Sequence, residues 1–244
     1  MLFFTINSCK DKPVADNAGP TGTLKVTFNN TVSGSPLVID AKSYTNPFGE
    51  NYVVKKFKYY ISSVKINNID KAAEEKESYH LIDEANEASK TFTYNAAPES
   101  YNTITFTIGV DSLRNVSGAQ TGALDPLNDM FWTWNSGYIM AKLEATSPSS
   151  TQVNNKVEYH TGGFTGVNNV LKKVTLVLRS GAYLDIRENK ISEIIIEANL
   201  NEWWQNSNDI KITDNPICTT PGALAKKIAD NYSKMFTVKN VINY

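Results

Sequence analysis

The sequence predicts an all-β protein: an antiparallel Greek-key β-sandwich, or a flattened barrel, with one short helix near the C-terminus. Tyrosine (12 residues) and phenylalanine (10 residues) are plentiful, and β-branched residues are common, a composition that favours sheet. A series of short apolar stretches is separated by turn-forming residues, as in antiparallel sandwiches. The chain of 244 residues also has a size that single all-β domains often reach.

Two regions are expected along the chain. Residues 1–22 combine a signal remnant with a tether, because residues 10–22 are polar and contain Pro13 and Pro20, and such a stretch cannot bury a core. Residues 23–244 are expected to form one domain. Its strands are predicted at residues 23–28, 37–39, 52–66, 79–82, 91–94, 102–110, 138–144, 156–159, 171–178, 191–200 and 236–238.

The strands of the first half are predicted from alternation. Residues 23–28 place every second residue, all apolar, on one face. In the longest stretch the apolar residues change parity at Ser62-Ser63, which predicts a β-bulge there. In residues 102–110 apolar residues alternate with threonines. We therefore expect Phe106 to face the core and Thr105 to face away from it.

The second half adds one buried strand and the helix. Residues 191–200 are rich in β-branched residues and apolar on both faces, as expected for a strand that is covered on both sides. Thr220-Pro221 has the form of an N-cap followed by the first helical residue. The apolar stripe of the helix follows at a spacing of four residues: Leu224, Ile228 and Tyr232.

Composition and motifs exclude several functions. The formal net charge is −1, so nothing marks the chain as a nucleic-acid binder. No apolar run is long enough for a membrane-spanning helix. The sequence contains no phosphate-binding loop, no nucleophile elbow, and neither an H-E-x-x-H nor a C-x-x-C motif. With two histidines and no strong carboxylate pair, we do not expect an enzyme.

Cys9 has a specific interpretation as a lipid attachment site. Ile6-Asn7-Ser8-Cys9 is similar to the lipobox that ends a bacterial lipoprotein signal peptide, and Lys10 favours sorting to the outer membrane. The residues before it are apolar but too few for a normal signal and lack a basic region, so we expect a clipped chain or an earlier start. The alternative is a free cysteine without a role. Cys218 would then be unpaired, and we expect it to be a small buried apolar side chain.

The most distinctive stretch is residues 122–144, GALDPLNDMFWTWNSGYIMAKLE. Trp132 and Trp134 are two residues apart, which on an extended strand places both indoles on one face. Turn-forming residues precede and follow the two tryptophans, so we expect a rigid segment. Both tryptophans, and Met130 beside them, also have an ordinary interpretation as core packing.

This stretch closely resembles the central signature of the MbnP-like copper-binding proteins, a family of exported bacterial proteins. The resemblance extends from Gly22 to the C-terminus, and it implies copper binding outside the cytoplasm. Three further stretches are similar to the same family: Gly109-Val110-Asp111-Ser112 with Asn115, Tyr159-His160-Thr161-Gly162-Gly163, and Ile228-Ala229-Asp230-Asn231 with Met235-Phe236.

The resemblance implies a copper site at His160. In the family a diheme peroxidase-type partner oxidises a tryptophan to kynurenine, whose aryl amine helps to bind copper, and we carry this role to Trp132 and Trp134 together. Met130 is a soft thioether that suits Cu(I). We expect copper where the tryptophan segment approaches His160, with His80, the sole other imidazole, as the second ligand. An ordinary hydrogen-bonded or solvated histidine is the alternative for His160.

A metal-free surface lipoprotein that binds an organic ligand or a protein partner is the competing hypothesis. It would use exposed aromatic residues such as Trp203-Trp204. A diheme peroxidase gene beside the gene for this chain would favour copper instead. Three aspartates near the tryptophans do not have the spacing of an EF-hand calcium loop, and turn-capping roles are predicted for them: Asp111, Asp125 and Asp129.

Overall fold

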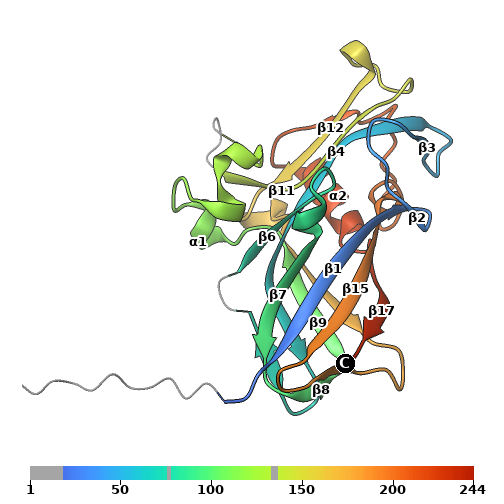
Figure 1. Cartoon of the computed structure of the whole chain (residues 1–244). Coiled ribbons are helices and arrows are strands. Elements are labelled where there is room, and N and C mark those ends of the chain that lie inside the picture. The colour runs from blue at the N-terminus through green and yellow to red at the C-terminus, as the bar shows by residue number, and fades with distance from the viewer. Residues whose placement is uncertain (1–18, 76–77, 133–136) are drawn as a thin grey trace, which may run out of the picture.

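The computed structural model describes residues 19–75, 78–132 and 137–244, and nearly all of its regular structure is β (Figure 1). Cys9, Trp134 and most of the predicted tether lie outside these residues. In the part of the chain that is described, no helix is long and apolar enough to cross a membrane.

The strands are β1 (Gly22–Val32), β2 (Ser35–Pro36), β3 (Ser43–Thr45), β4 (Asn51–Asn67), β5 (Ala72–Glu74), β6 (Tyr79–Asp83), β7 (Thr91–Ala96), β8 (Glu99–Tyr101), β9 (Thr103–Ile108), β10 (Phe131–Trp132), β11 (Gly137–Thr146), β12 (Lys156–Gly162), β13 (Lys172–Val177), β14 (Leu184–Ile186), β15 (Ile191–Asn199), β16 (Ile217–Cys218) and β17 (Phe236–Ile242). The helices are α1 (Ser112–Asn115), α2 (Ala223–Tyr232) and the 3-10 helices η1 (Glu87–Lys90), η2 (Gly122–Leu124), η3 (Pro126–Asn128), η4 (Val153–Asn155), η5 (Gly166–Asn168) and η6 (Leu200–Trp203).

Two main sheets form a flattened half-barrel, and β8 pairs with β14 in a small third sheet. The smaller sheet has the order β17-β15-β1-β2, with β7 also paired to β1. The larger has the order β13-β9-β4-β11-β12-β16, with β3, β5 and β6 also paired to β4. Most pairings are antiparallel, but β1 with β15 and β12 with β16 run parallel. The all-β prediction is confirmed, and the Greek-key order stays a prediction.

Aromatic rings from both sheets fill the space between them. Phe28 of β1 meets Tyr59 of β4 with ring centroids 6.2 Å apart and Phe106 of β9 at 5.7 Å. Phe236 of β17 closes the group at 5.1 Å from Phe106. All four side chains are buried, so the prediction that Phe106 faces the core is confirmed.

The sequence patterns located the bulge but misplaced one strand. The pairing of β4 with β9 shifts register between Ser62 and Lys65, and Ser63 has a φ of 53°. The predicted β-bulge is therefore confirmed. The strand predicted at residues 37–39 is wrong, because the chain leaves β2 after Pro36 and turns at Asp40, whose φ is 64°.

Residues 111–132, called the cap here, cover the outer face of β4 and β11. The cap contains α1, η2, η3 and β10, and Figure 1 shows α1 beside β6 and β11. Two tyrosine hydroxyls of the sheet bind cap carbonyls, Tyr60 to Ala123 at 3.0 Å and Tyr138 to Leu124 at 2.7 Å. The outer face of the sheet is therefore not solvated here, and polar groups on it have protein partners.

The C-terminal part buries the other two described tryptophans. Trp203 and Trp204 are fully buried, with the Trp204 ring 4.9 Å from that of Tyr52 and the Trp203 ring 5.1 Å from that of Tyr232 in α2. The hypothesis that Trp203-Trp204 form an exposed contact surface is therefore wrong. Helix α2 begins two residues later than predicted, after Gly222 rather than after Thr220.

Candidate metal centre

His160 lies on the outer face of β12, beside two carboxylates. Along β12 the side chains of Val157, Tyr159 and Thr161 are buried, and Glu158 and His160 alternate with them on the other face. The neighbouring strand β11 places Glu144 opposite Glu158. His160 Nε2 is 3.0 Å from Glu144 Oε1. One donor atom from each of the three side chains lies within 4.8 Å of the others, so they could share one metal ion.

Two lysines and a cap aspartate set the charge of this site. Lys56 Nζ lies 3.3 Å from Glu144 Oε2, and Lys142 Nζ lies 3.9 Å from Glu144 Oε1. Both ammonium groups are also 2.9 Å from Asp129 Oδ2. The hydrogen bond to His160, together with the charge of Lys56, holds the pKa of Glu144 below its ordinary value despite burial. Burial lowers the pKa of Lys142, whose side chain is 1% exposed.

Trp132 packs directly against the chain that follows His160. A Cβ atom added to Gly162 would lie 2.5 Å from Cη2 of the Trp132 indole, and closer still to Cζ3. Because Gly162 is two residues from His160 on β12, this added atom points to the same face as the imidazole. The prediction that the tryptophan segment approaches the His160 turn is confirmed for Trp132. Trp134 lies outside the described residues.

Beside the Trp132 indole is a hollow of about 350 Å³, walled mainly by aromatic, proline and small polar residues. It separates β10 and the start of β11 from the loop after β12. The residues that line it are Trp132, Gly137, Tyr138, Gly163, Phe164, Thr165, Asn168 and Pro221.

His80 lies on the other face of the same sheet. Its ring stacks on Phe92 with centroids 3.5 Å apart, and its Nε2 is 2.8 Å from Glu75 Oε2. The strand register aligns Asp83, Lys58, Lys142 and His160 in one row across β6, β4, β11 and β12. His80 is three residues from Asp83, so it points to the opposite face. It is also three strand spacings, about 14 Å, from the His160 strand.

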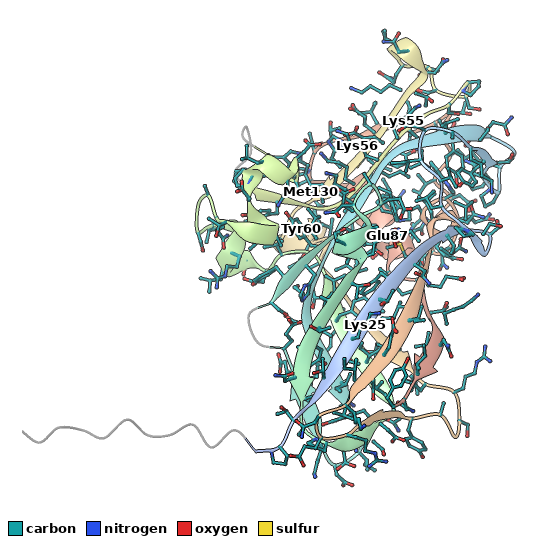
Figure 2. The ribbon with its side chains drawn as sticks, viewed as in Figure 1. Lys25, Lys55, Lys56, Tyr60, Glu87 and Met130 are labelled. Carbon is teal, nitrogen blue, oxygen red and sulfur yellow. The ribbon has the colours of Figure 1, made fainter. Side chains whose placement is uncertain are left out.

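The remaining predicted ligands have other surroundings. Met130 is fully buried in the cap (Figure 2). Cys218 is buried and unbridged, as expected, and burial raises the pKa of its thiol to about 11. The turn-capping roles are confirmed for two of the three aspartates, since Asp111 accepts from Arg114 N at 3.1 Å and Asp125 from Leu127 N at 2.9 Å. Asp129 is the C-cap of η3 in the left-handed conformation, with its N–H donating to Pro126 O, and its carboxylate binds two lysines instead of the turn.

Glu144 and Glu158 are the site residues that sequence reasoning missed. A signal for them exists, because Lys142 and Glu144 interrupt the otherwise apolar residues 138–145, and Glu158 precedes His160 by two. Charged residues two apart on a strand share a face. What the sequence does not provide is the pairing of β11 with β12, which brings the two charged pairs together.

The chemistry of the donor set suits Cu(II) better than Cu(I). One imidazole nitrogen and carboxylate oxygens are ligands that Cu(II) accepts, whereas Cu(I) prefers thiolate and thioether sulfur. Cys218 is buried against the core with a raised thiol pKa. The thioether of Met140 accepts a hydrogen bond from Val110 N at 3.2 Å. The fit to a single copper ion is therefore through His160 and the two glutamates.

Comparison with known proteins agrees with this architecture. The solved structure of MbnP from Methylosinus trichosporium is similar with a TM-score of 0.50 and 15% sequence identity, over 78% of this chain and 79% of that chain. At this identity the likeness concerns the fold. No match was found among curated proteins. The family model of MbnP matches residues 21–220, well over half of the sequence, and the chain therefore belongs to the MbnP family.

Proposed function

We propose that this protein binds copper outside the cytoplasm, at the site formed by His160, Glu144 and Glu158 beside Trp132, and that it acts as a binding protein and not as an enzyme. Membership of the MbnP family associates the chain with copper. The observation that carries the proposed site is the meeting, on one face of β12, of the three-residue donor cluster and the Trp132 indole.

His160 is the central ligand in this proposal. Its side chain is 16% exposed, and its one described hydrogen bond is to Glu144, which would turn from hydrogen-bond acceptor to metal ligand. Glu158 lies 2.6 Å from Lys156 Nζ, which is more than half exposed and free to move into solvent. A single imidazole with carboxylates binds copper less tightly than several imidazoles do, so we expect a modest affinity unless another nitrogen is added.

Oxidation of Trp132 would add that nitrogen. Two equivalents of peroxide, used by a diheme peroxidase-type partner, insert two oxygen atoms as the indole C2–C3 bond breaks and release two waters. Hydrolysis then removes the formyl group as formate and leaves kynurenine, with a ketone and an aryl amine. The indole packs on Gly162, two residues from His160, through Cζ3 and Cη2. The amine would form on Cε2, across the ring from this contact, so the opened side chain would have to turn to bring the amine to the donor cluster. Trp134 is the other candidate for the same reaction.

The proposed location is the outer membrane, with Cys9 as a lipidated N-terminus. The Ile6-Asn7-Ser8-Cys9 stretch and the polar residues after it support this location. An anchored copper protein facing the periplasm or the cell surface would meet both the metal and an exported oxidase there.

Copper titration of matched histidine variants tests the proposed site. We expect His160→Ala to weaken Cu(II) binding at least about tenfold and to remove the nitrogen coupling from the electron paramagnetic resonance spectrum. His80→Ala is the control, since His80 lies on the opposite face and should leave both readouts unchanged. Equal binding by wild type and His160→Ala would remove His160 from the site.

Mass spectrometry tests the tryptophan modification independently. The peptide that contains Trp132 and Trp134 should gain about 4 Da in protein coexpressed with the oxidase, and nothing in protein made without it. The oxidised protein should bind copper more tightly. An unchanged mass in protein from the native host would refute the kynurenine proposal and leave the histidine site to be judged by titration.

The competing function keeps one specific observation in its favour. The hollow beside Trp132 is lined by Tyr138, Phe164 and Pro221 and is about 350 Å³ in volume, near the lower end of small-molecule pockets. A metal-free ligand-binding lipoprotein would use this hollow in place of the buried Trp203-Trp204. Failure of copper to bind, together with quenching of tryptophan fluorescence by an aromatic ligand, would favour it.

A further inference from the structure

The proposed metal ligand Glu144 belongs to a ring of four charged side chains that alternate in sign. Lys56 contacts both Glu144 Oε2 at 3.3 Å and Asp129 Oδ2 at 2.9 Å. Lys142 contacts Asp129 Oδ2 at 2.9 Å and lies 3.9 Å from Glu144 Oε1. The two lysines come from β4 and β11, the glutamate from β11 and the aspartate from the cap. This charge ring therefore links the metal site to the segment that carries Trp132.

The two lysines of the charge ring differ in their freedom to move. Lys142 is 1% exposed, and its ammonium also donates to the main-chain oxygen of Asp129. Lys56 is 44% exposed, and its described partners are the two carboxylates alone. Moving Lys142 would leave a charge buried without its partners, which is strongly unfavourable. Moving Lys56 would only transfer an ammonium group from two carboxylates into water.

We propose that Lys56 is an exchangeable counter-cation of Glu144, which leaves for solvent when a metal ion binds, while Lys142 stays on Asp129 and holds the cap. The proposal rests on the proposed function, because it concerns the same site. In metal-free protein Lys56 offsets the negative charge of the ring. When copper binds Glu144, the positive charge of the metal repels this ammonium group at close range.

The consequence is that Lys56 opposes metal binding. Replacing it with methionine keeps the side chain as far as Cε, removes the charged ammonium group, and leaves Asp129 paired with Lys142. We therefore expect Lys56→Met to bind Cu(II) about two- to fivefold more tightly than wild type, an effect of the size expected for a partly exposed charge pair. Because salt screens exposed charges, the difference should narrow as ionic strength rises.

Lys55 provides a matched control on the same strand. It is next to Lys56 (Figure 2) and is exposed to a similar extent, but it pairs with Asp40 at 3.0 Å. Lys55 is the extra residue where the register of β4 against β11 shifts, so it has no partner position opposite Glu144, and its ammonium group is held by Asp40 outside the charge ring. Lys55→Met should leave the affinity for Cu(II) unchanged, and its thermal stability without metal shows the cost of removing an ordinary surface lysine.

The test combines calorimetric titration with chemical labelling of lysines. CuCl₂ is titrated into wild type, Lys56→Met, Lys56→Gln and Lys55→Met, with ZnCl₂ as a second divalent probe. Wild type is also acetylated with and without Cu(II), and the modified lysines are measured by mass spectrometry. Acetylation of Lys56 should rise when Cu(II) is bound, whereas acetylation of Lys55 and of Lys142 should not change.

The outcomes separate this inference from the function on which it rests. If wild type binds Cu(II) through His160, but both Lys56 variants bind with unchanged or lower affinity, the exchange is refuted and the copper site stands. Unchanged acetylation of Lys56 on copper binding would refute it equally. If wild type binds neither probe metal, the proposed site and the exchange fall together.

Discussion

Gly162 is the position at which a single methyl group most directly tests the proposed site. An alanine Cβ there would lie 2.5 Å from Cη2 of Trp132 and 3.1 Å from the main-chain oxygen of Tyr138. Carbon atoms pack at about 3.5–4.0 Å, so the indole would have to move by about 1 Å. Gly162 has no positive φ, so the ring and not the backbone conformation is what excludes a side chain.

The expected cost of Gly162→Ala follows from this overlap. Overpacking a buried site costs about 1–3 kcal/mol, and Trp132 is only 6% exposed, so the ring has little free space. Replacing glycine also restricts the unfolded chain, which returns about 0.4–1 kcal/mol. The net loss in unfolding free energy should be about 0.5–2.5 kcal/mol, which lowers the melting temperature by about 1–10 °C in a chain of this size.

Calorimetry and tryptophan fluorescence measure the two effects of Gly162→Ala separately. The melting temperature reports the cost, and a shift in emission reports movement of the indole. Gly222→Ala is the control, because an added Cβ there meets nothing within 4 Å. Adding Trp132→Leu to Gly162→Ala should recover part of the loss, with a coupling of about 1 kcal/mol. Wild-type melting and emission in Gly162→Ala would show that the ring does not lie against Gly162.

Three further substitutions test the core, a buried carboxylate and the anchor. Phe106→Ala should lower the free energy of unfolding by about 3–5 kcal/mol in chemical denaturation, whereas Thr105→Ala should change it little. Equal losses in the two variants would mean that the register of β9 is wrong. Burial would raise the pKa of Glu50, but hydrogen bonds from Thr213, Asn46 and Ile212 outweigh it and lower the pKa. Its stabilising effect is therefore present above about pH 4 and lost in acid. Glu50→Gln should cost about 1.5–3 kcal/mol at pH 7, a difference that should shrink in acid melts. With a full signal peptide supplied, Cys9→Ala should release the protein from membranes on fractionation, and retention would exclude the lipid anchor.

Local sequence patterns predicted a strand correctly where the burial of one face alone determined which positions are apolar. The alternation around Phe106 follows from one face against the core and one away from it, and the parity change at Ser62-Ser63 follows from a bulge with a positive φ at Ser63. The prediction of a strand at residues 37–39 was wrong because three consecutive apolar residues do not show the alternation of a half-buried strand. Leu37 is buried from a loop, where side-chain burial requires no strand pairing.

The exposure of Trp203-Trp204 was predicted wrongly for a related reason. The two residues follow a strand and are flanked by polar residues, so their local sequence indicates a surface loop. In the structure η6 turns them under α2, where Trp203 Nε1 donates to the Sδ atom of Met235 at 3.3 Å. The residues that bury the two tryptophans here lie about 30 positions further along the chain. The sequence next to the tryptophans therefore does not indicate their burial.

At the candidate site, too, the local sequence identified one residue but not its neighbours in space. His160 was identified by its own motif, but its partners lie outside that motif, Glu144 on β11 and Glu158 earlier on β12. Counting imidazoles selected His80 as the second ligand, and a count carries no information about the two faces of a sheet. His80 is three positions from Asp83, the residue of β6 that lies in one row with His160. An offset of three positions on a strand directs the two imidazole rings to opposite faces. Among the residues that the structure describes, the carboxylates that lie beside His160 are Glu144 of β11 and Glu158 of β12, and the proposed function therefore assigns the remaining ligands to them and to a kynurenine amine.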